Sequence, residues 1–82
     1  MTVRYKYKLP SWEKGREIAN KIANEYGLSL EEREETIVIY DDEEKIFISF
    51  FLDPREFTFV KAKIADEKKE WFEKNLEPLL KI

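Results

Sequence analysis

The chain contains no cysteine and no histidine, and only two glycines and three prolines occur among its 82 residues. Without cysteine there can be no disulfide, thiolate metal ligand or thiol nucleophile. Without histidine the chain lacks the commonest general base and the commonest metal ligand at neutral pH. Aspartate and glutamate remain, but they fall in expected turns and on helix surfaces. We therefore expect no enzyme, no cofactor and no metal site.

Long hydrophobic runs are also missing. The first ten residues, MTVRYKYKLP, alternate charged with apolar groups, so we expect neither a signal peptide nor a membrane span, and a soluble chain. A length of 82 residues with 43% hydrophobic content predicts a single domain, residues 1–82, with one core of two layers and no room for an enclosed substrate site. Charged residues make up 40% of the chain, yet the net charge of -3 by itself identifies no partner.

Hydrophobic periodicity predicts four strands and two helices. Strict alternation predicts a strand at 2–9, and steps of three and four predict a helix at 12–26, capped by Ser11 and closed by Gly27. Further strands are expected at 36–40, 45–52 and 57–64, and a helix at 67–81 capped by Asp66, with a kink near 75–77 caused by Pro78. Residues 28–35 fit either a helical turn or the start of a strand.

The element order β-α-β-β-β-α predicts an α+β fold. We expect a two-layer open-faced sandwich: a four-stranded, mostly antiparallel sheet with two helices on one face, and one parallel pair that involves the first strand. Apolar residues on both faces of the last two strands favour the spatial order 1-4-3-2 over 1-2-3-4. Gly15 lies on the buried stripe of its helix, which indicates a close approach of helix to sheet more than a gap for a ligand.

The segment KIFISFF, residues 45–51, has large apolar side chains on both sides of a strand. A four-residue loop would pair Tyr40 with Lys45 and place the isoleucines of both strands in the core. At the next turn, an even loop length would bury Lys61 and Lys63, so the charges favour an odd one. Phe47 and Phe51 then belong to the face that no helix covers.

This open face is the candidate binding surface. It is expected to carry aromatic and basic side chains from all four strands: Arg4, Lys6, Lys8, Tyr40, Phe47, Phe51, Phe57, Phe59, Lys61 and Lys63, with Lys45, Ser49 and Val38 among them. A large exposed apolar patch is unusual for a monomer, so we expect a homodimer, a protein partner, or cover by residues 28–35. The alternative is single-stranded nucleic acid, because rings stack on bases and cations follow phosphates. No RNA-recognition-motif signature is present.

The acidic turn Asp41, Asp42, Glu43 and Glu44 offers carboxylates that could hold a hard cation. It lacks the spacing of a calcium loop, so a solvated turn is the favoured interpretation.

The element order resembles one half of a TATA-binding-protein saddle with one strand missing, a family that also uses an open concave sheet face with phenylalanines. The resemblance is to topology and to the character of that face, and no site residue follows from it. The whole chain also resembles de novo designed α/β proteins: caps at Ser11 and Asp66, the turns DDEE and DPRE, and helix surfaces of Glu and Lys. That resemblance implies a stable fold without a natural function. Gly15, Pro78 and the exposed phenylalanines depart from it, and the composition is similar to that of hyperthermophile proteins too.

Overall fold

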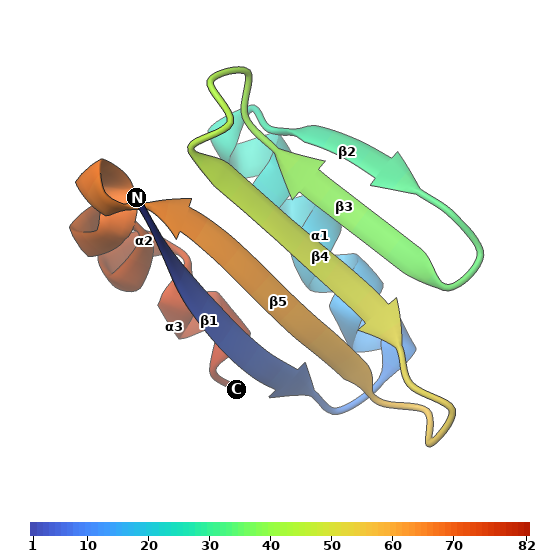
Figure 1. Cartoon of the computed structure of the whole chain (residues 1–82). Coiled ribbons are helices and arrows are strands. Elements are labelled where there is room, and N and C mark those ends of the chain that lie inside the picture. The colour runs from blue at the N-terminus through green and yellow to red at the C-terminus, as the bar shows by residue number, and fades with distance from the viewer.

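A computed structural model of residues 1–82 shows an α+β domain with one five-stranded sheet and helices on one of its faces (Figure 1). The strands are β1 (Thr2–Leu9), β2 (Ser29–Glu32), β3 (Thr36–Tyr40), β4 (Ile46–Leu52) and β5 (Thr58–Ala65). The helices are α1 (Trp12–Tyr26), α2 (Lys69–Asn75) and α3 (Glu77–Leu80), with a 3-10 turn η1 (Asp66–Lys68) before α2. The expected α+β class is confirmed, but the sheet has five strands where four were predicted.

The additional strand is β2, in the segment that the sequence left undecided. It pairs with β3 at the edge of the sheet, so residues 28–35 extend the sheet and do not cover its open face. The sheet order is β1-β5-β4-β3-β2, and every neighbouring pair is antiparallel. The prediction of a parallel pair that involves the first strand is therefore wrong. One more strand between α1 and β5 reverses the direction of β5, which then runs antiparallel to β1.

Strand registers agree with the predicted faces, although one pairing differs. Tyr40 lies opposite Phe47 and not opposite Lys45. That shift of two residues leaves every side chain on its predicted face, because side chains alternate with a period of two. The pairing of β4 with β5 is as expected, with Phe50 opposite Val60. The buried core between sheet and helices is almost entirely aliphatic and aromatic: Leu9, Ile18, Ala19, Ile22, Ala23, Ile37, Ile39, Ile46, Ile48, Phe50, Val60, Ala62, Ile64, Phe72, Leu76 and Leu80.

Helix α1 has the bounds and caps that its sequence predicts. The Ser11 hydroxyl accepts a hydrogen bond from the backbone N–H of Lys14 (3.1 Å), and Gly27 adopts the left-handed conformation at φ 65°. Gly15 meets the sheet at β5. A Cβ built there would lie 2.4 Å from Oγ1 of Thr58, a fully buried residue whose hydroxyl donates to the carbonyl of Ser11 (2.7 Å). The predicted close approach of helix to sheet is thus confirmed.

The C-terminal helix is divided, as Pro78 predicts. Helix α2 ends at Asn75 and α3 begins at Glu77, because a proline has no N–H to continue the helical hydrogen bonds. Phe72 is the buried residue of α2, while Trp71 is only half-buried and packs edge-on against Tyr26. The expected cap at Asp66 is wrong. Residue Asp66 begins η1, and no side chain caps that turn.

Helices α2 and α3 are joined to β1 by two tyrosines. The Tyr5 hydroxyl donates to Glu73 (2.8 Å) and the Tyr7 hydroxyl donates to Glu77, while both rings pack near Phe72. Burial, followed by the hydrogen bond to Glu73, raises the pKa of Tyr5 from 10.0 to about 12. Burial and the bond to Glu77 raise the pKa of Tyr7 as well.

These pKa shifts predict a loss of stability in alkali. The protonated tyrosines contribute fully below pH 10.0, the ordinary tyrosine value, and the contribution is lost as the pH rises toward the folded-state value of about 12 for Tyr5. Urea unfolding at a series of pH values should therefore show a falling free energy of unfolding above pH 10.0. The double change Tyr5→Phe, Tyr7→Phe should make that fall shallower. Tyr26→Phe, which removes a tyrosine hydroxyl that has no hydrogen bond to a carboxylate, is the matched control variant.

Candidate functional site

The open face of the sheet is turned toward the viewer in Figure 1, with α1 behind β3 and β4 and the C-terminal helices behind the β1 side. Strand register places nine of the ten predicted surface residues on this face. The pairs that connect them are Arg4 with Lys63, Lys6 with Lys61, Lys8 with Phe59, Phe59 with Phe51, Phe47 with Lys63, and Tyr40 with Phe47. Phe57 precedes β5, and its ring lies 4.2 Å from Lys8 Nζ. These pairings bring aromatic rings and cations into one continuous surface.

Five cations occupy one half of the open face, on the neighbouring strands β1 and β5. They are Arg4, Lys6, Lys8, Lys61 and Lys63, and we call them the basic half. All five are exposed, and none forms an ion pair. Like charges stand directly opposite one another at Arg4 with Lys63 and at Lys6 with Lys61, an arrangement that destabilises a sheet. No carboxylate of the chain forms an ion pair that would offset this repulsion.

Aromatic rings lie at the centre of the open face, on β4, the middle strand of the five. Phe47 is 44% exposed and Phe51 is 36% exposed, large fractions for phenylalanine. The ring of Phe47 stacks on that of Tyr40, with centroids 6.5 Å apart, and Phe51 pairs with Phe59 of β5. The face therefore presents an apolar centre beside its basic half.

Both hollows of the molecular surface lie on the open face. The larger, of about 810 Å³, is lined mainly by β2 and β3 side chains, among them Glu31, Val38 and Tyr40. The smaller, of about 380 Å³, lies over β1 and β5. Phe47 and Lys63 line both hollows, so the ring of Phe47 stands between them. A partner that filled both would enclose that ring.

The other half of the open face, over β2 and β3, carries negative charge. Glu31 and Glu44 line the larger hollow and form no ion pair, and we call them the acidic half. Two cations line the same hollow, Arg33 and Lys63 of the basic half. Glu31 accepts a hydrogen bond from the Tyr40 hydroxyl (2.8 Å), and this bond is the main cause that raises the pKa of Tyr40. The face is thus divided by charge on either side of β4.

Sequence reasoning missed Glu31 and Glu44 as members of this surface. In the structure a separate strand places Glu31 opposite Val38, while Glu32 pairs with Arg16 of α1 (3.1 Å). The sequence SLEE alternates, with Leu30 packed against the core and Ser29 and Glu31 outward. This alternation is the pattern that could have predicted the strand and the position of Glu31.

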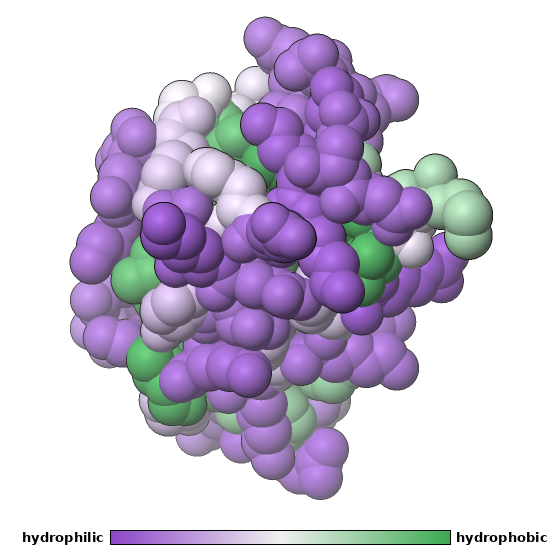
Figure 2. Space-filling view, turned by 90° about the vertical axis from the view of Figure 1, so that its left-hand side faces the viewer, coloured by the Kyte–Doolittle hydropathy of each residue, from purple (hydrophilic) through white to green (hydrophobic).

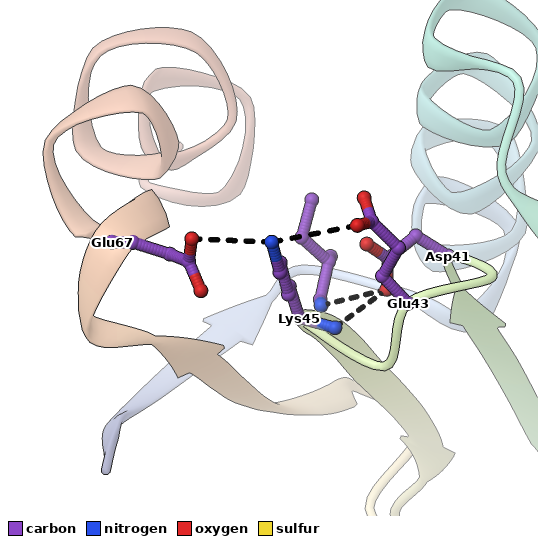
Figure 3. A network of polar contacts seen from close by, with 5 residues as sticks. Asp41, Glu43, Lys45 and Glu67 are labelled. Carbon is purple, nitrogen blue, oxygen red and sulfur yellow. Dashed lines mark hydrogen bonds and ion pairs between the residues drawn. The ribbon is translucent and has the colours of Figure 1, made fainter.

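Lys45, which the sequence also placed on the open face, is engaged elsewhere. Its Nζ lies 3.1 Å from Glu67 of η1 and 3.5 Å from Glu43 (Figure 3). The hydrogen bond to Glu67 is the first cause that raises the pKa of Lys45. Unlike the five cations of the basic half, Lys45 already has its anionic partners within the chain. Its role is to join the β3–β4 turn to η1.

The first carboxylate of the acidic turn, that of Asp41, forms hydrogen bonds with nearby backbone N–H groups. Oδ1 of Asp41 accepts hydrogen bonds from the N–H groups of Lys45 (2.8 Å) and Ile46 (3.0 Å), as Figure 3 shows. Glu44 adopts a left-handed conformation at φ 58°, which brings the chain back into β4. No three acidic side chains of the chain are placed together to hold a metal ion. The turn therefore has a structural explanation for its acidic residues.

The side of the molecule at the β1 edge of the sheet differs from the open face. Figure 2 views the side of the molecule that carries β1, α2 and α3, and shows it as mainly hydrophilic, with small separate hydrophobic spots. Lysine side chains along an edge strand oppose pairing with another strand. No helix is both long enough and apolar enough to cross a membrane.

Comparisons of the chain with protein-family models, with curated proteins and with solved structures found no match.

Proposed function

We propose that this chain is a non-enzymatic binding domain that associates with an acidic protein surface through its open face. The observation that carries the proposal is the exposed ring of Phe47 between the two hollows, beside five cations that form no ion pair within the chain. Burial of exposed aromatic rings supplies affinity, and charge complementarity selects the partner and speeds association.

A second candidate function is the binding of single-stranded nucleic acid by the same surface. It is favoured by the direct opposition of Arg4 with Lys63 and of Lys6 with Lys61, because phosphates would relieve the repulsion between these cations. Phe47, Phe51 and Phe59 lie next to them and could stack on bases. The acidic half opposes this function, since it would repel a polyanion that crossed the whole face.

One titration separates the two candidates. In dilute solution, the chain is titrated with a glutamate–tyrosine copolymer, with a single-stranded oligonucleotide, and with poly-lysine as the control. Protein association predicts tighter binding to the copolymer than to the oligonucleotide, weakened by salt because exposed charges are screened. The reverse order would favour the nucleic-acid function.

The variant Phe47→Ala, Phe59→Ala gives the matching test of the surface. Loss of two aromatic anchors should weaken binding to the preferred polymer by at least about tenfold. The control variant Lys69→Ala, Lys74→Ala removes exposed cations from α2, away from the open face, and should change binding little. If neither polymer binds at low salt, or if the aromatic variant binds as well as the original chain, the open face is not a binding surface.

A further inference from the structure

We propose that the occupant of the open face is a second copy of this chain, related to the first by a two-fold axis that runs along β4. This inference rests on the proposed function and names its partner. It follows from three features of the face: the order of the strands, the division of charge, and the position of the exposed rings.

The charge division makes the face complementary to itself. The basic half covers β1 and β5, the acidic half covers β2 and β3, and β4 lies between them as the third of five strands. A two-fold axis along β4 turns the second sheet over and exchanges its halves. The basic half of each chain then lies over the acidic half of the other. The five cations form no ion pair in their own chain, and four of them stand in two repelling pairs. In this dimer they lie over the half that carries Glu31 and Glu44 of the second chain.

The alternative axis is excluded by the same charges. A two-fold axis in the plane of the interface but perpendicular to the strands would place the basic half over its own copy. That arrangement would add repulsion between chains to the repulsion already present between Arg4 and Lys63. Two sheets that pack face to face favour nearly aligned strands, which both axes provide, so the charges decide between them.

The exposed rings lie where this axis requires an apolar contact. Residues on a two-fold axis meet their own copies, so Phe47 and Phe51 of β4 would pack against the same residues of the second chain. These two side chains are the most exposed large apolar residues within the strands. Ser49 lies between them on the same strand and is small, which leaves room for the opposing rings to interdigitate.

Further acidic residues at the rim of the face support the same pairing. Glu34 and Glu35 in the β2–β3 turn, and Asp42 in the β3–β4 turn, are exposed and form no ion pair. They flank the acidic half at both ends of β3. A polyanion would be repelled by this side of the face, whereas a second copy brings its basic half to it. The observations therefore favour a second copy over nucleic acid.

The test exchanges the charges of one half at a time and measures association by sedimentation. Variant one is Lys61→Glu, Lys63→Glu, and variant two is Glu31→Lys, Glu44→Lys. The unaltered chain should form a dimer. Each variant alone should bind itself at least about tenfold more weakly, because like charges now face each other across the interface. An equimolar mixture of the two should form a heterodimer of nearly the original affinity, since each new charge meets its opposite.

Two controls separate this result from misfolding or a general charge effect. Variant one converts the repelling pairs on β1 and β5 into attracting ones, so its thermal unfolding temperature in dilute solution should not fall. The variant Lys69→Glu, Lys74→Glu makes the same charge change on α2 and should remain dimeric. A monomer at every concentration, or a mixture that associates no better than its components, overturns the inference. If the chain stays monomeric but still binds the copolymer through Phe47, the inference fails and the proposed function stands.

Discussion

Replacing Phe50 with alanine should lower the free energy of unfolding by about 3 to 5 kcal/mol, the usual cost of removing a buried phenylalanine from a packed core. Replacing Phe51, the next residue of β4, should lower it by about 1 kcal/mol or less, because exposed side chains contribute little to stability. Phe50 is fully buried, whereas Phe51 is 36% exposed. The two changes remove the same atoms from the same strand and differ only in the face of the sheet that they affect.

Urea unfolding of both variants in dilute solution measures the difference. Low concentration matters, because the proposed dimer would add stability that depends on Phe51 and on protein concentration. In association measurements the order of the two effects should reverse. Phe51→Ala should weaken self-association, whereas a folded Phe50→Ala variant should not. Equal losses of stability at the two positions would contradict the assignment of the open face.

Gly15→Ala should destabilise the chain by about 1 to 3 kcal/mol, the cost of forcing extra volume into a packed site. In an exposed helix the same change stabilises by about 1 kcal/mol, so the sign of the effect is the result to examine. The new Cβ would meet three atoms of the Thr58 side chain at 2.4 to 2.9 Å. Either α1 must move from the sheet, or Thr58 must turn and lose its hydrogen bond to Ser11.

A double-mutant cycle with Thr58→Ala tests this explanation. Thr58→Ala alone should cost about 1 kcal/mol through the lost hydroxyl bond to Ser11. In that background Gly15→Ala should cost less than it does in the original chain, because two of the three crowding atoms are gone. If Gly15→Ala stabilises the chain, or if the two changes are additive, the close contact between α1 and β5 is not what selects glycine here.

Elements with strong local signals could be predicted well from the sequence. Helix α1 has a sustained apolar stripe between a serine cap and a glycine cap, so both of its ends were predictable. The faces of the strands were predictable for a different reason. A register error of two residues, as at Tyr40, moves no side chain to the other face, and an error of one would have buried Lys61 and Lys63.

Elements that depend on partners distant in the chain could not be predicted in the same way. Strand β2 is four residues long, and three of them are polar, so its hydrogen bonds to β3 stabilise it more than its own hydrophobic pattern does. Missing that strand also led to the wrong direction of β1 relative to its neighbour. The cap expected at Asp66 failed because the chain leaves β5 through a 3-10 turn.

For the candidate site, the sequence alone determined which side chains share the open face, because the alternation of a strand is a local property of its backbone. Only the tertiary structure decided which of them are neighbours. The pairing of β1 with β5 sets Arg4 against Lys63, and the pairing of β2 with β3 brings Glu31 onto the same surface. Strand order joins residues far apart in the chain, so the division of the face into a basic and an acidic half arises from packing and not from any local pattern.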